Sequence, residues 1–255
     1  MGGQMDESRK KATICLVIPC FNEAKRLQTK AFEDAIVKQN LHFLFVNDGS
    51  SDHTLEVLQA FASQYPNQVR IVDSTPNLGK GNAVRKGMLD SLLWKPFDYT
   101  GYWDADLSAP LSEVKIIVEP MLAAGYQFAF GSRLLRIGGN IKRNGFRHYV
   151  SRISATFAAE TLGLPVYDTQ CGAKIFSHQI VEGLFKMPFI SSWLFDVELF
   201  FRAKQLWNKA EFYKHTIEIP ITKWTEVGGS RLRFNNLIKV PLELFKIRNF
   251  YKNTW

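Results

Sequence analysis

The sequence lacks any uninterrupted apolar stretch of about 18 residues, the length that a membrane-spanning helix requires. The nearest candidate, Pro188–Phe201, is interrupted by Asp196 and Glu198. The first 11 residues are polar and hold no apolar run of the kind found in signal peptides, so residues 1–11 are predicted to form a mobile leader. We therefore expect a chain that does not cross a membrane, whereas peripheral contact with one stays open.

Cysteines and, locally, acids are also scarce. Cys15, Cys20 and Cys171 are odd in number and lack zinc-type spacing, which favours a reducing, cytosolic compartment and no structural disulfide. Residues 133–152 hold six lysines and arginines and no acid, and residues 231–255 hold six more against one acid. Together with the net charge of +8, these stretches indicate an anionic partner. Nucleic acid, an acidic membrane and a phosphorylated substrate are the alternatives at this point.

What the sequence does contain is an alternation of short apolar runs with helical segments. Buried strands are predicted at 13–18, 42–46, 69–72, 99–103 and 128–130. Helices are predicted at about 23–39, 51–64, 83–93, 110–125, 149–162 and 193–207, and a later strand at 216–219. This alternation is typical of βαβ units, and hence of an α/β fold with a mostly parallel central sheet flanked by helices.

Polar clusters follow the predicted strands at 19–23, 47–50, 77–81 and 104–108. Because ligands of such sheets bind beyond the carboxyl ends of the strands, we expect the clusters to share one site. Asp104 and Asp106, one residue apart at a strand end, can share Mg²⁺ or Mn²⁺, with diphosphate oxygens completing the shell. A solvated turn with two acids is the alternative, and the position on the shared edge favours the metal site.

The neighbouring clusters suit a nucleotide. Asp48 can accept a hydrogen bond from a base N–H, although an Asx-turn with a helix cap accounts fully for Ser51 and Asp52. Lys80 stands between two glycines at a helix start, where an ammonium and backbone N–H groups suit an anion. The spacing is not that of a P-loop, which argues against an NTPase.

Later segments carry further candidates with open alternatives. Arg133 and the basic residues after it either hold a diphosphate or lipid phosphate, or form a solvated face. Asp196 and Glu198 lie in an apolar helix, where they reach into the site or pair with a base such as Arg202. Residues 234–255 form a basic amphipathic segment that lies in a membrane interface or packs on the domain.

Eight segments, in order along the chain, together resemble the family 2 glycosyltransferases of GT-A fold. Within that family they are most similar to the dolichyl-phosphate β-glucosyltransferases, with the mannosyltransferases as near relatives. The segments are VIPCFNEAKRL (17–27), FVNDGSSDHT (45–54), NLGKGNAVRKGM (77–88), DADLSAP (104–110), FGSR (130–133), DTQCGAKIF (168–176), FDVELFFRA (195–203) and VGGSRL (227–232).

The resemblance implies a set of site residues. Substrate binding is expected of Pro19, Asn22, Glu23, Asp48, Gly79, Lys80, Asp104 and Gln170. Catalytic roles are expected of Asp106, Arg133, Asp196 and Arg231, and Asp104 and Asp106 would bind Mg²⁺ or Mn²⁺. Some mannosyl relatives place a glutamine ligand where this chain has Ser108, so the remaining metal ligands would be water and diphosphate.

The expected organisation is one GT-A domain over 12–233, with a nucleotide-sugar half at 12–132 and an acceptor half at 133–233. The expected reaction is inverting transfer of glucose from UDP-glucose to a polyprenyl or dolichyl phosphate, on the cytoplasmic face of a membrane. GDP-mannose is the second donor. With a hydroxyl acceptor instead, Asp196 would act as general base. A nucleotidyltransferase and a nucleic-acid-binding module are not favoured, because the first loop lacks glycines and acids line the predicted edge.

Overall fold

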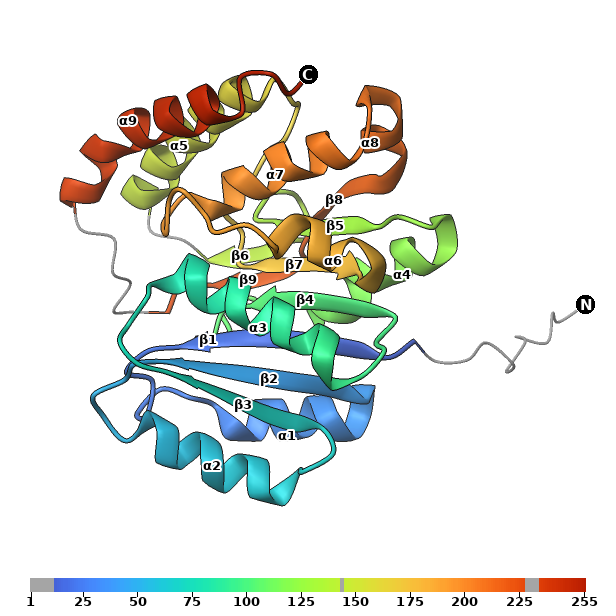
Figure 1. Cartoon of the computed structure of the whole chain (residues 1–255), viewed down its shortest axis with the longest axis vertical. Helices are drawn as coiled ribbons and strands as arrows, with labels where there is room; N and C mark the ends of the chain where they lie inside the picture. The colour runs from blue at the N-terminus through green and yellow to red at the C-terminus, as the bar shows by residue number, and fades with distance from the viewer. Residues whose placement is uncertain (1–11, 143–144, 228–233) are drawn as a thin grey trace, which may run out of the picture.

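The computed structural model describes residues 12–142, 145–227 and 234–255. The predicted leader at 1–11 and the predicted phosphate ligand Arg231 lie outside these ranges. The described chain forms a central sheet with helices on both faces (Figure 1). Within the described part, no helix is long and apolar enough to span a bilayer.

The sheet has the strand order β3-β2-β1-β4-β7-β5-β8. Its strands are β1 (Ile14–Cys20), β2 (Leu41–Asp48), β3 (Val69–Ser74), β4 (Tyr99–Trp103), β5 (Phe128–Ser132), β7 (Ala173–Ser177) and β8 (Thr216–Pro220). Every pairing is parallel except those of β7, which runs antiparallel between β4 and β5. β6 (Asn140–Lys142) and β9 (Lys223–Thr225) form a separate parallel pair. The mostly parallel α/β sheet is therefore confirmed.

Apolar side chains on both faces of each strand explain why the sheet is covered twice. In β1, Cys15 and Val17 enter one core, and Leu16 and Ile18 enter the other, because successive side chains point to opposite faces. The helices are α1 (Thr29–Gln39), α2 (Thr54–Gln64), α3 (Lys80–Trp94), α4 (Glu113–Ala124), α5 (Gly145–Leu162), α6 (His178–Phe185), α7 (Phe195–Leu206), α8 (Lys209–His215) and α9 (Phe234–Phe250). α1, α2 and α4 contribute to one core and α3, α6 and α7 to the other.

One predicted helix begins later than expected. The predicted helix at 23–39 starts only at Thr29. Asn22 has a left-handed φ of 55°, and the N–H of Glu23 donates to Thr54 Oγ1 at 2.8 Å. The Glu23–Thr54 hydrogen bond ties the chain after β1 to the start of α2, so the chain forms a turn before α1 can begin.

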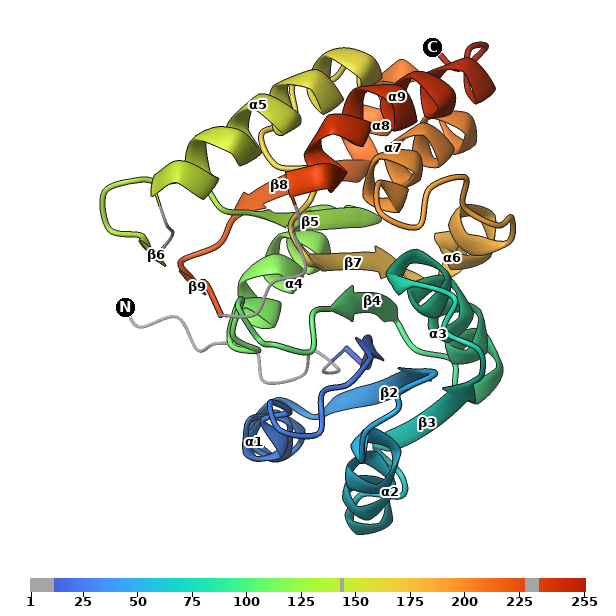
Figure 2. The same cartoon turned by 90° about the vertical axis from the view of Figure 1, so that its left-hand side faces the viewer.

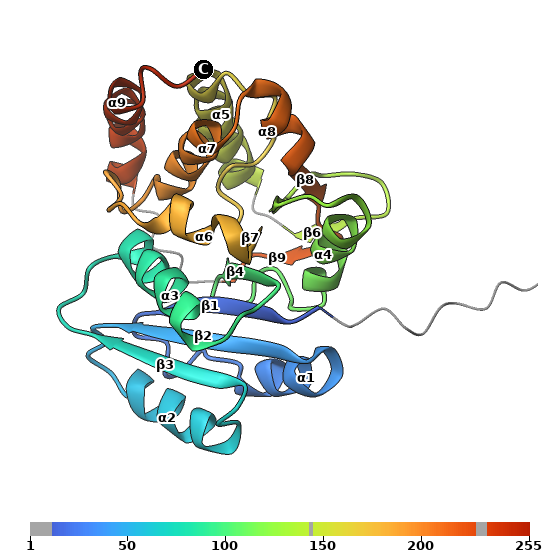
Figure 3. The same ribbon diagram turned by 45° about the vertical axis from the view of Figure 1, so that its right-hand side comes forward.

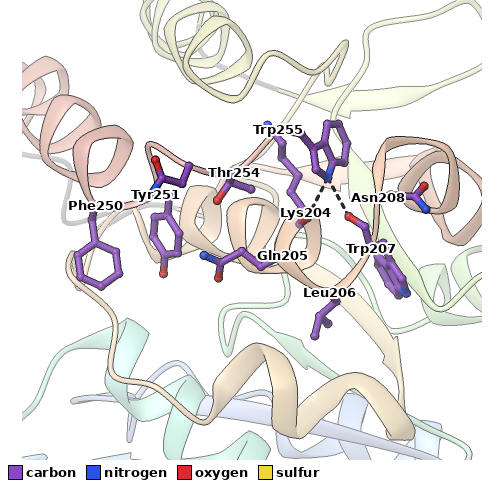
Figure 4. Close-up of a pocket in the computed structure, with 10 residues that line it drawn as sticks. Lys204, Gln205, Leu206, Trp207, Asn208, Phe250, Tyr251, Thr254 and Trp255 are labelled. Atoms are coloured by element: carbon purple, nitrogen blue, oxygen red, sulfur yellow. Dashed lines mark hydrogen bonds between the residues drawn. The ribbon is translucent and has the colours of Figure 1, made fainter.

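The C-terminal segment packs on the domain. Val240, Leu244 and Ile247 are buried along one side of α9. Tyr251, directly after the helix, is also buried, and its ring stacks on Phe201 of α7. Beyond the helix, Trp255 Nε1 donates to the carbonyls of Lys204 at 2.9 Å and Trp207 at 2.8 Å (Figure 4). Packing on the domain was one of the two predicted alternatives, and the exposed side of α9 remains available for the other.

Candidate active site

The predicted residues of the first half meet at the carboxyl edge of the sheet. The loops after β1, β2 and β4 and the start of α3 converge there, on the side that Figure 2 turns towards the viewer. Parallel strands β2, β1 and β4 lie side by side, so their carboxyl ends share an edge. The convergence expected of the four polar clusters is thus present.

An ion pair joins two of these loops. Lys80 Nζ lies 2.5 Å from Asp104 Oδ1, and both side chains remain partly exposed. Burial by itself lowers the pKa of Lys80, but the carboxylates of Asp104 and Asp196 outweigh it and the pKa is raised. Lys80 is therefore a firmly protonated ammonium at the N-terminus of α3, where the helix dipole also favours an anion.

Asp106 sits in a crowded negative environment. Burial, and after it the charge of Asp104, raises the pKa of the Asp106 carboxyl. The N–H of Ser108 donates to Asp106 Oδ1 at 2.9 Å and offsets only part of that charge. Two crowded carboxylates are a donor set that fits a hard divalent cation. In the described ranges no three or more acidic, histidine or cysteine side chains converge as a metal cluster, so this pair is the candidate site.

A tight backbone contact fixes Asp104. Its N–H donates to the carbonyl of Gly172 at 3.1 Å, at the end of the loop that precedes β7. A Cβ atom on Gly172 would overlap the Asp104 carboxylate, so only glycine allows this approach. The loop 168–172 therefore positions the acid that pairs with Lys80.

We expect Gly172→Ala to lower catalytic activity at this site by on the order of a hundredfold, because the added methyl group displaces the Asp104 carboxylate. Initial rates at saturating substrate measure the effect. Gly183→Ala in α6 is the matched control, because its Cβ would meet only the flexible end of Leu206. Equal rates in the two variants would contradict the proposed role of Gly172.

Asp48 holds the loop that carries Lys80. Its Oδ1 accepts the N–H of Leu78 at 2.8 Å and its Oδ2 that of Gly79 at 2.9 Å. Its carbonyl accepts the side-chain amide of Asn77 at 2.7 Å. The structure thus shows Asp48 positioning residues 77–79, and the predicted contact of its carboxylate with a nucleoside base stays a prediction.

The first loop is tied to the second. Asn22 Oδ1 accepts the N–H of Ser51 at 2.8 Å, and its own N–H donates to Ser50 Oγ at 3.0 Å. Pro19 lies in β1 beside Val46 of β2. Glu23 is buried and its Oε1 accepts the Arg26 guanidinium at 2.6 Å. These residues border the site edge, and their predicted nucleoside contacts stay predictions.

Arg133 is held by a residue that was not among the predicted site residues, Asp168. The guanidinium binds both oxygens of the Asp168 carboxylate, with Nε–Oδ2 at 2.6 Å and Nη2–Oδ1 at 2.8 Å. Burial lowers the pKa of Arg133, but this carboxylate more than reverses it, so the pKa is raised. Among the described residues the guanidinium hydrogen-bonds only to Asp168, and the predicted contact of Arg133 with a phosphate stays a prediction. Gln170 follows on the same loop, and its Nε2 is buried without a hydrogen-bond partner among the described residues.

Asp196 pairs with a base of the acceptor half, as one of the two predicted alternatives has it, although the prediction did not name this base, Lys174. Lys174 Nζ, fully buried in β7, lies 2.5 Å from Asp196 Oδ1, and the hydroxyl of Tyr102 donates to the same oxygen. Lys174 also donates to the carbonyls of Thr169 at 2.9 Å and Cys171 at 2.8 Å. One ammonium thus anchors both Asp196 and the loop that positions Asp104 and Arg133.

Glu198 forms the ion pair with Arg202 that was one of the two predicted alternatives for it. Its carboxylate lies 3.7 Å from Arg202 Nη2 and accepts the N–H groups of Ile190 at 3.0 Å and Ser191 at 2.7 Å. It therefore pins the loop between α6 and α7. The three cysteines are free and buried, and burial raises the pKa of the Cys171 thiol to about 12, so it remains a neutral thiol.

The sequence profile described as Glycosyl transferase family 2 matches residues 15–185, which include β1 to β4, the Asp104–Asp106 pair and the loop before β7. The chain belongs to glycosyl transferase family 2. The predicted family and enzyme class are therefore confirmed.

Several curated relatives of this glycosyltransferase are named dolichyl-phosphate beta-glucosyltransferase. One from Trichomonas vaginalis is 27% identical over 252 residues, covering 94% of this chain and 74% of the relative. The human protein is 27% identical, covering 93% and 75%. The Saccharomyces cerevisiae protein is 29% identical, also covering 93% and 75%.

Solved structures confirm the GT-A fold. Glucosyl-3-phosphoglycerate synthase from Mycobacterium tuberculosis, in complex with Mn²⁺ and UDP-glucose, superposes with a TM-score of 0.65. The match is 18% identical and covers 94% of this chain and 79% of that one. A complex of the same enzyme with Mn²⁺, UDP and glucosyl-3-phosphoglycerate gives the same TM-score of 0.65.

Proposed function

We propose that this family 2 glycosyltransferase moves glucose from UDP-glucose to a polyprenyl or dolichyl phosphate, with inversion at the anomeric carbon. The observation that carries the proposal is the Lys80–Asp104 pair beside Asp106, a set of charges suited to a metal-bound diphosphate. Relatives that span most of this chain are named for glucosyl transfer to dolichyl phosphate. The fold neighbours bind UDP-glucose with Mn²⁺.

On the donor side, Asp104 and Asp106 would hold Mg²⁺ or Mn²⁺, which supplies positive charge to the departing UDP. Lys80 and the N-terminal N–H groups of α3 add charge to the same side. Asp48 keeps residues 77–79 in the conformation that presents Lys80. Pro19, Asn22 and Glu23 would border the nucleoside.

On the acceptor side, a phosphate monoester has a second pKa of about 6 and is largely dianionic at neutral pH, so it can attack without a strong base. This agrees with the surroundings of Asp196, whose Oδ1 already receives Lys174 and Tyr102. Arg133, oriented by Asp168, and Arg231 would hold phosphate groups of the donor or acceptor. We further propose that the enzyme works peripherally on the cytoplasmic face of a membrane.

A donor screen tests the proposal. Purified protein with Mn²⁺ or Mg²⁺ and a short-chain polyprenyl phosphate is incubated with UDP-glucose, UDP-galactose or GDP-mannose, and released UDP or GDP and the glycolipid are measured. We expect UDP release and a glucosyl phospholipid only with UDP-glucose. Release of GDP with a mannosyl lipid would contradict the donor assignment. Transfer only to hydroxyl acceptors would contradict the acceptor assignment and restore Asp196 as the candidate base.

A further inference from the structure

Exposed apolar side chains gather around the start of α3, where the donor phosphates would lie. They come from the loop before α3, the loop between α6 and α7, and the outer side of α9. We define them as the apolar rim: Leu78, Met187, Ile190, Trp193, Leu242 and Phe245. They are 37–65% exposed, and so many large apolar groups on adjoining segments are typical of an interaction surface.

Hydrogen bonds hold the central part of the rim rigidly. The carboxylate of Glu198 accepts the N–H groups of Ile190 and Ser191, at 3.0 and 2.7 Å. Arg202 donates to the carbonyls of Met187 and Pro188, each at 2.7 Å. Buried groups of α7 thus hold the backbone of this loop in a conformation that leaves the side chains of Met187 and Ile190 exposed.

The loop between α6 and α7 is hydrogen-bonded to α9 on one side and to the start of α3 on the other. Ser191 Oγ donates to Glu243 Oε2 at 2.5 Å, which fastens the loop to α9, and Figures 1 and 3 show this loop passing beneath α9. On the other side, the N–H of Gly81 donates to the carbonyl of Ser192 at 3.2 Å, and a Cβ atom on Gly79 would meet the Ser192 side chain. The loop of the rim therefore lies between α9 and the end of α3 that carries Lys80.

The charges around the rim favour a lipid surface over a protein partner. Lys186, Lys246 and Arg248 are exposed beside it, and Lys186 lies 3.9 Å from the exposed Glu182 of α6. The loop 186–194 contains no acid, and the only acid of α9, Glu243, is hydrogen-bonded to Ser191. Apolar groups interleaved with bases, with a tryptophan among them, match the headgroup region of an anionic bilayer.

We propose that the apolar rim docks the enzyme on an anionic bilayer, so that the site edge faces the lipid headgroups. The benefit to catalysis rests on the proposed function, because a lipid phosphate lies at the headgroup level where docking would place Lys80. The binding itself requires neither donor nor acceptor.

Sedimentation with phosphatidylcholine vesicles containing about 30% phosphatidylserine tests the docking. We expect Met187→Ser/Ile190→Ser and Leu242→Ser/Phe245→Ser each to weaken vesicle binding by about tenfold or more. The matched controls are Val37→Ser in α1 and Leu93→Ser in α3, which are 73% and 80% exposed at the opposite edge of the sheet. These controls should bind like the wild type. Equal binding by rim and control variants would overturn the proposal.

Two further measurements separate the remaining outcomes. Brominated lipids should quench tryptophan fluorescence in the wild type, and less in Trp193→Phe. Transfer to a water-soluble short-chain acceptor should be unchanged in the rim variants, while transfer to an acceptor embedded in vesicles should fall with binding.

A dimer that the rim substitutions dissociate, with no vesicle binding, would identify a second copy as the occupant and overturn the lipid assignment. Vesicle binding without any transfer by the wild type would contradict the proposed function and leave the docking supported.

Discussion

Asp106→Asn is expected to lower kcat by on the order of a thousandfold. The substitution keeps the shape of the side chain and removes its charge. Burial and Asp104 already raise the pKa of the Asp106 carboxyl, so its ionised form lacks full compensation within the protein. A divalent cation would provide that compensation, and without the Asp106 charge the cation would keep a single carboxylate, that of Asp104, which Lys80 also engages.

Initial rates and calorimetric titration of UDP-glucose, each with and without Mn²⁺, measure this effect. In the wild type we expect donor binding to tighten with Mn²⁺ and activity to disappear in excess chelator. In Asp106→Asn, Mn²⁺ should no longer improve donor binding. Asp34→Asn on α1 is the control, because that carboxylate is 45% exposed and, among the described residues, pairs only with lysines of its own helix. Turnover that survives in Asp106→Asn, or in chelator, would refute the metal assignment.

Much of the donor half could be predicted because its signals are local. The predicted strand at 99–103 coincides with β4, and β2 and β5 extend the predicted runs by a few residues. Such apolar runs need only the period of a strand and a boundary of turn residues to be recognised. Ligands of parallel sheets bind beyond the carboxyl ends of the strands, so Asp48, Lys80 and Asp104 could be assigned to one site without knowledge of any contact.

The structure of the acceptor half was harder to predict from the sequence, because its contacts join residues that are far apart along the chain. β7 is a short strand that includes the fully buried Lys174, and a lysine inside an apolar run does not predict a central strand. Its antiparallel insertion between β4 and β5 also breaks the βαβ alternation. The Arg133–Asp168 pair spans 35 residues, so no local period reveals it.

Both missed side chains nevertheless lie in the segment DTQCGAKIF, which carried part of the family resemblance. The segment indicated that this stretch matters, whereas the structure shows how it acts. Asp168 orients Arg133, Gly172 contacts Asp104, and Lys174 binds the carbonyls between them. Their function is to position the residues that the sequence had already identified.

Lys174→Met is expected to lower the free energy of unfolding by about 3–5 kcal/mol, because it leaves the buried Asp196 carboxylate without its cation. It also leaves the Thr169 and Cys171 carbonyls without their donor. Since those carbonyls belong to the loop that positions Asp104, we expect folded variant protein to show reduced kcat as well. Urea denaturation, at a temperature where the variant is folded, measures the free energy of unfolding. Initial rates of transfer at low temperature measure kcat.

A double-mutant cycle isolates the charge effect from the loss of packing. Asp196→Asn combined with Lys174→Met should be more stable than Lys174→Met alone, because the uncompensated charge is gone, although the loop carbonyls still lack their donor. Lys115→Met is the control, because its partner Glu119 lies 3.6 Å away on the surface and both side chains are mostly exposed, so about 0.5 kcal/mol or less should be lost. If Lys174→Met and Lys115→Met cost the same, or if the two substitutions at the buried pair are additive, Lys174 does not anchor Asp196 in the way the geometry implies. A stable double variant that still turns over slowly would then assign the remaining defect to the loop before β7.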